Sequence, residues 1–124
     1  MNKGIIAINK PRDWTSNDVV NKIKHMVKPN KVGHLGTLDP MATGVLLVTI
    51  GKATKLFDIM QQKHKTYVAT FEFGYETDSL DATGSVVKTN KEIPTQSQIE
   101  QVLPKFIGKI SQIPPLFSAK SVNG

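Results

Sequence analysis

The chain has 124 residues, of which 39% are hydrophobic and 21% charged, a balance typical of a globular domain and not of a disordered tail. Its 16 Lys and Arg against 10 Asp and Glu give a net charge of +6, which favours a polyanionic partner because bound phosphates release counterions. The absence of cysteine excludes disulfides and thiolate metal sites. No apolar run reaches the roughly 20 residues that span a bilayer, and the apolar stretch 5–8 is too short for a signal peptide, so the cytoplasm is the expected compartment.

The N-terminal part predicts a strand followed by a helix. Residues 4–9 form a short apolar run that Pro11 ends, since proline cannot continue a ladder. Thr15 and Asp18 have the spacing of a capping box. Apolar residues then recur at helical spacing up to Pro29, so we expect an amphipathic helix that ends before this proline.

Residues 31–44 show no clean period and predict a loop with an imposed backbone path. The residues that shape this path are Gly33, Gly36, Pro40 and Gly44. Residues 45–50 predict a buried strand, which Gly51 ends. A helix is expected over residues 54–61, with Leu56, Phe57 and Met60 as its apolar stripe.

In residues 67–73 apolar and polar positions alternate, which predicts a strand. Residues 77–84 are rich in turn formers, and 85–88 predict a short returning strand. Thr95 and Gln98 open a last helix that Pro104 bends or shortens. Its inward residues are expected to be Ile99, Val102, Leu103, Phe106 and Ile107.

The C-terminal residues 110–118 are expected to be extended because Pro114 and Pro115 forbid a helix. Strands and helices are interleaved without strict alternation. The sequence therefore predicts an α+β fold with a mixed, largely antiparallel sheet and flanking helices. No repeat or linker is visible, so one unit is expected, and an unpaired sheet edge would favour association of copies.

Residues 33–44 are the densest candidate for chemistry. Their three glycines permit positive φ or close approach to a ligand. Asp39 is followed by Pro40, which favours extended backbone at Asp39. A carboxylate on a stiff loop before a buried strand suits catalysis; a solvated aspartate in a surface turn is the alternative.

Three other chemistries fail on the residues present. A P-loop is excluded because Gly51-Lys52 is followed by Ala53, where Ser or Thr is needed. His25, His34 and His64 stand apart, so they do not form a clustered zinc site. There is no G-x-S-x-G nucleophile elbow.

Five segments of the chain together form a set of motifs. The first is the loop Gly33-His34-Leu35-Gly36-Thr37-Leu38-Asp39-Pro40 through Gly44. The others are Asn9-Lys10-Pro11 with Thr15-Ser16; Gly51 to Lys55; Lys65 to Tyr67 with Gly74, Thr77-Asp78, Asp81 and Gly84; and Gln112 to Gly124. In order and spacing, over essentially the whole chain, these segments resemble the TruB family of tRNA pseudouridine synthases.

The resemblance implies that uridine 55 (conventional tRNA numbering) in the T-arm becomes pseudouridine. The C1′–N1 bond breaks, the uracil turns, and C5 joins C1′, which needs no metal and no cofactor. Asp39 matches the essential carboxylate, which could add to the ribose, add to the base or remove a ribose proton; a carboxylate near an oxocarbenium-like C1′ is also the arrangement of glycosidases.

The resemblance also assigns roles around Asp39. Tyr67 matches an active-site tyrosine that stacks on the target base, with a core aromatic as the alternative. His34 matches a histidine that holds everted nucleotides, and Lys55 is expected to contact the RNA backbone. Gly36 and Thr37 are expected to contact RNA too, and the matching residues Lys10 and Pro11 are expected to support the site.

Members of this family run to more than twice this length, so the resemblance implies the N-terminal part of the catalytic domain. The remainder, with an active-site arginine and an RNA-binding PUA domain, is expected elsewhere, and this piece alone is expected to be inactive. One departure is Lys120, since the family usually has its lysine at the position of Ser121. A non-catalytic RNA-binding or tRNA-chaperone module is the competing function, and the sequence leaves the oligomeric state open.

Overall fold

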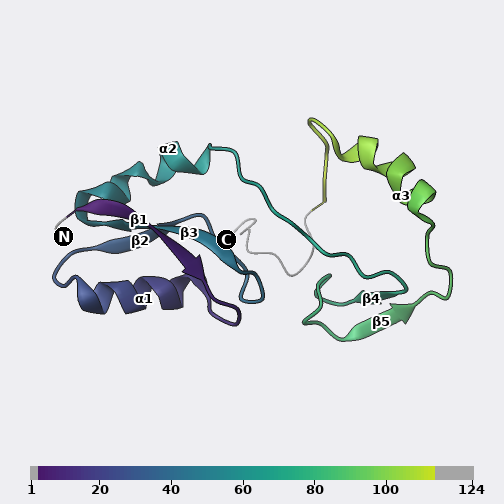
Figure 1. The fold of residues 1–124 in the computed structure, drawn as a ribbon, viewed down its shortest axis with the longest axis horizontal. Coiled ribbons are helices and arrows are strands. Elements are labelled where there is room, and N and C mark those ends of the chain that lie inside the picture. Colours follow the sequence, from purple (N-terminus) through teal and green to yellow (C-terminus); the bar gives the residue numbers. More distant parts are fainter. Residues whose placement is uncertain (1–2, 114–124) are drawn as a thin grey trace. The chain divides into compact units, whose positions relative to one another are not determined.

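Residues 3–113 are described by a computed structural model, in which the chain forms two units, residues 1–67 and 68–124. The first unit is built on a three-stranded antiparallel sheet of β1 (Gly4–Lys10), β2 (Val32–Leu35) and β3 (Gly44–Ile50). The strand order is β1-β3-β2 (Figure 1). Lys10 pairs with Gly44, so the chain that leaves β1 runs beside the loop that enters β3.

Helix α1 (Ser16–Met26) covers one face of this sheet. Thr15 is its N-cap, and the predicted capping box is confirmed: the Asp18 N–H donates to the Thr15 hydroxyl at 3.0 Å, and the Thr15 N–H donates to the Asp18 carboxylate at 2.8 Å. Val19 packs on β3 and forms the buried core of the unit. The core residues are Val19, Leu46 and Val48, with Ile6, Ile8, Ile23, Val32 and Leu38 packed around them.

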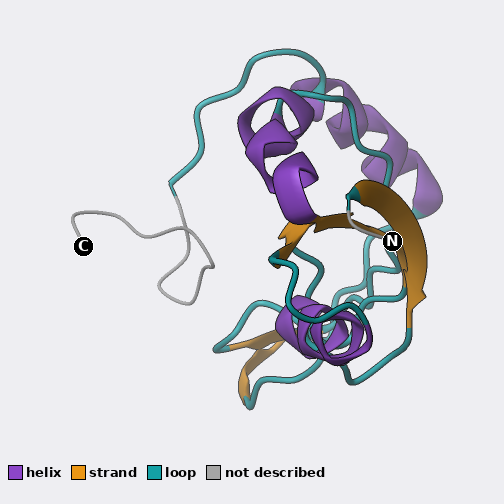
Figure 2. Ribbon diagram, turned by 90° about the vertical axis from the view of Figure 1, so that its left-hand side faces the viewer, coloured by secondary structure: helices purple, strands orange, loops and turns teal. Residues whose placement is uncertain are grey.

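The other face of the sheet carries a 3-10 helix, η1 (Gly51–Leu56), that runs into α2 (Phe57–Gln61), as the two views in Figures 1 and 2 agree. The sequence predicts one helix over residues 54–61 here. The first turn is tighter than expected because Gly51 has φ 62° and its carbonyl accepts from the Thr54 hydroxyl at 2.9 Å. Of the expected apolar stripe, Leu56 and Phe57 stay partly exposed.

The second unit contains a two-stranded antiparallel hairpin, β4 (Tyr75–Thr77) and β5 (Val86–Thr89). Helix α3 (Gln96–Val102) follows, and a 3-10 turn, η2 (Leu103–Phe106), continues it. Thr95 and Gln98 open this helix, as predicted, and they form a capping box. The α-helix stops two residues before Pro104, as predicted, because a proline inside the helix removes a backbone donor.

The prediction of a strand at residues 67–73 is wrong. This segment has neither helix nor strand, and Val68 is fully exposed. Alternation of apolar and polar residues favours a strand, but a strand forms only where a neighbouring segment pairs with it. None of residues 3–113 pairs with residues 67–73. The predicted return strand does exist as β5, which pairs with β4 instead.

The predicted apolar stripe of the last helix is also not buried. Val102, Leu103, Phe106 and Ile107 are between 43% and 78% exposed. Among the described residues of the second unit only Thr77 is buried, so this unit has no apolar core of its own within residues 68–113. The extended segment predicted for 110–118 has neither helix nor strand at 110–113, and its remainder lies outside the described residues.

The prediction of a loop from residue 31 onward is wrong for its first part, because residues 32–35 form β2. The glycines in and next to residues 32–35 favour a loop, but this segment forms a strand because it pairs with β3, with His34 opposite Val48. The predicted fold class is confirmed: every strand pair in the described part is antiparallel, and helices flank the sheet. Within residues 3–113 no helix is long and apolar enough to cross a membrane.

Candidate active site

Asp39 lies on the loop between β2 and β3, at the first position of a tight turn. The Ala42 N–H donates to the Asp39 carbonyl at 3.0 Å, and Pro40 occupies the second position, where its fixed φ suits a β-turn. Positive φ brackets the loop, with 86° at Gly36 and 126° at Gly44. These glycines therefore set the path that carries Asp39, because other residues are strained at such angles.

The backbone just after Asp39 is held from the end of β1. The Pro40 carbonyl accepts from the Asp13 N–H at 2.7 Å and from the Lys10 Nζ at 3.2 Å. These two bonds join segments about 30 residues apart in the chain. They follow from the pairing of Lys10 with Gly44, which brings the two connections together.

Lys10 is fully buried, although lysine is almost always exposed. Its Nζ donates to the carbonyls of Pro11 at 3.0 Å, Trp14 at 2.5 Å and Pro40 at 3.2 Å. An ammonium has three donors, so all of them are satisfied by backbone oxygens. The supporting role expected for Lys10 and Pro11 stays a prediction, and these bonds make it testable.

Ser16 holds the backbone just before Asp39. Its Oγ accepts from the Leu38 N–H at 2.9 Å and donates to the Leu38 carbonyl at 3.2 Å. Sequence reasoning missed this residue, because a hydroxyl at a helix start is expected to cap that helix. The only feature of the sequence that pointed to Ser16 was its place in the Thr15-Ser16 motif.

The Asp39 side chain is exposed. Among residues 3–113 it takes part in no hydrogen bond or ion pair, whereas the backbone on both sides of it is fixed. Because its backbone is fixed and its oxygens bond to none of residues 3–113, the Asp39 carboxylate is available to a reacting group.

His34 and Gly36 interact directly within the loop. The His34 Nδ1 lies 2.5 Å from the Gly36 carbonyl. A carbonyl only accepts, so Nδ1 carries the proton and Nε2 is the nitrogen left for another partner. Thr37 is exposed between this pair and Asp39, so the structure brings these loop residues together.

Tyr67 and Lys55 are less closely tied to the loop. Tyr67 is 64% exposed at the end of the first unit, and Lys55 is exposed on η1, across the sheet from α1. The chain does return to the loop just before Tyr67, since a Cβ added to Gly36 would lie 3.4 Å from Lys65 Cε. No group of three metal-ligating side chains occurs in the described part of the chain, and Lys120 and Ser121 lie outside it.

Comparison with known proteins identifies the family. Residues 24–124 match the family model described as TruB family pseudouridylate synthase (N terminal domain). The chain belongs to the TruB family. It is 48% identical over 122 residues to the tRNA pseudouridine synthase B of Fusobacterium nucleatum, covering 98% of this chain and 42% of that protein.

Two further relatives give the same result. The tRNA pseudouridine synthase B of Francisella philomiragia is 47% identical over 123 residues, 98% of this chain and 41% of that protein. The enzyme of that name from Ureaplasma urealyticum is 45% identical over 125 residues, all of this chain and 55% of that protein. This TruB-family chain thus spans about half or less of the length of these relatives.

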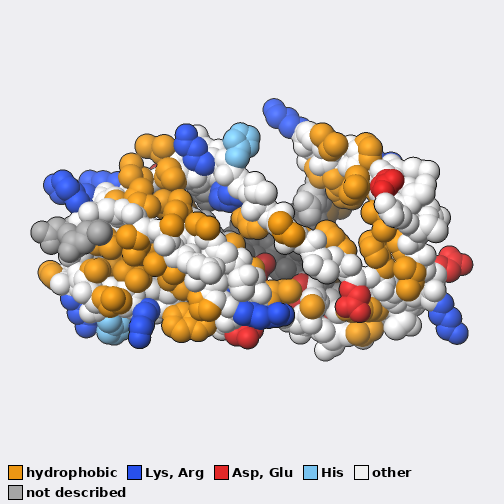
Figure 3. Space-filling view, in the orientation of Figure 1, with side chains coloured by type: hydrophobic (Ala, Val, Ile, Leu, Met, Phe, Trp, Pro, Cys, Tyr) orange, Lys and Arg blue, Asp and Glu red, His pale blue; other side chains and the backbone are white. Residues whose placement is uncertain are grey.

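Positive charge in the TruB-family chain is concentrated in the first unit. Residues 1–67 contain 11 Lys and Arg against 4 Asp, a net charge of +7, whereas residues 68–124 contain 5 Lys against 6 Asp and Glu, a net charge of −1. Figure 3 shows Lys and Arg spread over the surface of the first unit. The unit that carries Asp39 is therefore the one that attracts a polyanion.

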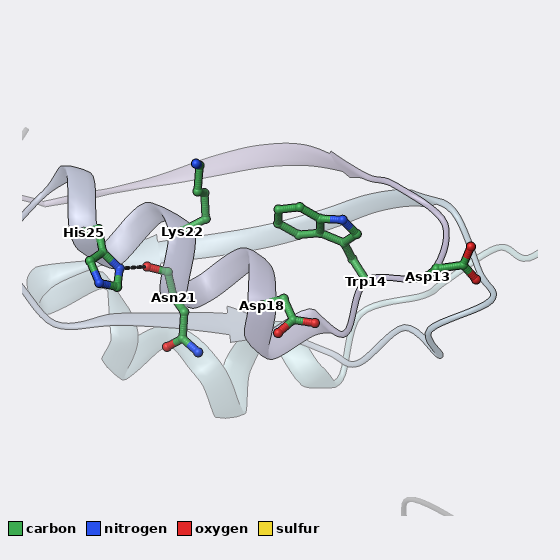
Figure 4. A pocket seen from close by; sticks show the side chains of 6 residues that line it. All are labelled: Asp13, Trp14, Asp18, Asn21, Lys22 and His25. Carbon is green, nitrogen blue, oxygen red and sulfur yellow. Dashed lines mark hydrogen bonds between the residues drawn. The ribbon is translucent and has the colours of Figure 1, made fainter.

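A pocket of about 440 Å³ lies along α1, and its lining contains no residue of the loop between β2 and β3. It is lined by Asp13, Trp14, Asp18, Asn21, Lys22 and His25 (Figure 4). His25 lies on the exposed surface of α1, and its Nδ1 donates to the Asn21 carbonyl at 2.7 Å. The lining mixes both charges and contains none of the predicted site residues, so it gives no reason to move the site from Asp39.

Proposed function

We propose that the protein is a tRNA pseudouridine synthase that isomerises uridine 55 in the T-arm of tRNA, with Asp39 as its essential carboxylate. The observation that carries this proposal is an exposed carboxylate on a fixed turn, without a partner among residues 3–113, in a chain 45–48% identical to proteins named tRNA pseudouridine synthase B. Residues 1–124 supply the N-terminal part of the catalytic domain, and the enzyme acts in the cytoplasm without a cofactor.

The geometry suits chemistry at the sugar–base linkage. When the C1′–N1 bond breaks, C1′ becomes electron-poor, and the Asp39 carboxylate stabilises it by charge or by a covalent bond. Addition of the carboxylate to the base and removal of a ribose proton are the two other roles open to Asp39. In each case C5 replaces N1 at C1′, the C5 proton is lost, and N1 gains a proton.

The other site residues assist by holding the everted nucleotide. Tyr67 stacks on the target base, because its exposed ring offers an apolar face. His34 contacts the nucleotide through Nε2, since its Nδ1 donates to the Gly36 carbonyl. Lys55, Gly36 and Thr37 face the RNA backbone, and the positive charge of the first unit attracts the phosphates.

The test is Asp39→Asn in the whole protein, assayed on a T-arm stem-loop labelled with tritium at uridine C5. We expect release of tritium to fall by about 100-fold or more, the scale of a lost catalytic group, while affinity for RNA stays within about threefold. Asp58→Asn is the matched control, because Asp58 is an exposed aspartate of α2 in the same unit. Equal turnover in the two variants would remove Asp39 from its role.

A non-catalytic RNA-binding or tRNA-chaperone module is the second candidate, and the +7 charge of residues 1–67 favours it. It predicts RNA binding that weakens steeply as salt rises, without any tritium release from the unsubstituted protein.

A further inference from the structure

Within residues 3–113 the Ser16 hydroxyl donates to and accepts from a single residue of the loop. Its hydroxyl accepts from the Leu38 N–H at 2.9 Å and donates to the Leu38 carbonyl at 3.2 Å. A hydroxyl has one proton to donate, and here it is committed to this carbonyl. Ser16 is only 3% exposed, so water is largely kept from replacing either bond.

The Leu38 carbonyl belongs to the peptide group that joins Leu38 to Asp39. Because a peptide group is planar, a bond to that carbonyl also orients the Asp39 nitrogen. On the other side, the Asp39 carbonyl is held by the Ala42 N–H at 3.0 Å. The Asp39 Cα is thus suspended between two fixed peptide groups, and only the side-chain torsions remain free.

Ser16 is not needed to cap its own helix. Thr15 is the N-cap, and its hydroxyl accepts from the Asp18 N–H at 3.0 Å while Asp18 accepts from the Thr15 backbone. The helix start is therefore satisfied without Ser16. The Ser16 hydroxyl makes both of its hydrogen bonds to Leu38, 22 positions away in the chain. A serine in the first turn of a helix ordinarily bonds to its own helix instead.

We propose that Ser16 is a positioning residue of the active site, whose hydroxyl orients Asp39 through the Leu38 peptide group. This inference rests on the proposed function of Asp39. Removal of the hydroxyl leaves both backbone groups of Leu38 without their partner, and the Asp39 turn shifts or becomes mobile. A misplacement of about 1 Å at a reacting group can lower turnover by about 100-fold.

The test compares Ser16→Ala with Thr49→Val in the whole protein. Thr49 is a matched control: it is 1% exposed, and its hydroxyl donates to the Gly33 carbonyl at 3.1 Å, outside the loop that carries Asp39. Both variants lose one buried hydroxyl, so both should lower the melting temperature. Only Ser16→Ala should lower kcat by about 10- to 100-fold, with the Kd for a T-arm stem-loop unchanged within about threefold.

A second readout does not depend on activity. Amide hydrogen exchange at Leu38 should become faster in Ser16→Ala, because the Leu38 N–H loses its acceptor, and should stay unchanged in Thr49→Val. The inference is overturned if kcat of Ser16→Ala stays within about twofold of that of Thr49→Val at a temperature where both are folded, or if exchange at Leu38 does not change. Asp39→Asn, assayed in parallel, tests the proposed function separately: if it is inactive while Ser16→Ala is not, only the role of Ser16 fails.

Discussion

Lys10→Met is the perturbation whose effect on stability follows most directly from the structure. Methionine keeps an unbranched side chain of similar length but removes the ammonium, which donates to the carbonyls of Pro11, Trp14 and Pro40. Hydrogen bonds to a charged group contribute about 1.5–3 kcal/mol each, so the three bonds together contribute about 5–9 kcal/mol.

Two effects offset most of this loss. Holding an ammonium away from water costs several kcal/mol, and this cost disappears when Lys10, which is fully buried, becomes methionine. In addition, the Pro40 carbonyl keeps its bond from the Asp13 N–H at 2.7 Å. We therefore expect Lys10→Met to lower the free energy of unfolding by about 2–4 kcal/mol.

Urea unfolding measures this change as a lower midpoint at unchanged m-value. The matched control is Lys22→Met, since Lys22 is exposed on α1, and its substitution should stay within about 0.5 kcal/mol of the unsubstituted protein. If Lys10→Met loses less than about 1 kcal/mol, or no more than the control, the three carbonyls are not stabilised by Lys10 as the geometry implies.

Two further predictions concern other parts of the chain. Gly84→Ala should lower the free energy of unfolding by about 1–3 kcal/mol, because the added Cβ would collide with the Ser79 Oγ and lie 2.9 Å from the Ser79 backbone nitrogen, whereas Gly33→Ala, with its nearest atom at 3.5 Å, should cost less in the same urea assay. The hydroxyl and then the N–H of Thr15 bond the Asp18 carboxylate and lower the pKa of Asp18 below its ordinary value of 3.8. Since the folded pKa is the lower one, this stabilisation is complete above the unfolded value and is lost as pH falls from about 4 through the folded value. The melting temperatures of the unsubstituted protein and Asp18→Asn should thus differ at about pH 7 and converge near pH 2; a difference that persists in acid contradicts the reasoning.

Rules that act over three or four residues predicted the helix ends well. Thr15 and Asp18 form the capping box that their spacing indicates, and Thr95 with Gln98 opens the last helix as expected. Pro104 shortens the last helix for an equally local reason, since its ring and its missing N–H act on the preceding turn. Such features need no knowledge of the rest of the fold.

Pairing between distant segments was the part that pattern alone could not supply. Residues 67–73 alternate like a strand, yet no segment within residues 3–113 pairs with them. Residues 32–35 look like a loop, yet they pair with β3. In both cases, whether the segment forms a strand depends on the presence of a pairing strand and not on the sequence of the segment itself.

The same limit applies to the candidate site. Glycines and proline around Asp39 indicated a shaped loop, and positive φ at Gly36 and Gly44 agrees with that. The bonds that fix this loop come from Lys10 and Ser16, which are 30 and 22 residues away from their partners. Periodicity and composition carry no information on such contacts.

The uneven distribution of charge has a consequence for the kinetics of encounter. Attraction between exposed charges extends about 8 Å at physiological ionic strength, so a nucleic acid that diffuses toward the chain is drawn to residues 1–67, with their charge of +7, and not to residues 68–124. The association rate should then respond to charge substitutions in the first group and be nearly indifferent to those in the second. Under the proposed function, the stretch of chain that sets the rate of RNA capture is thus the same stretch that contains Asp39.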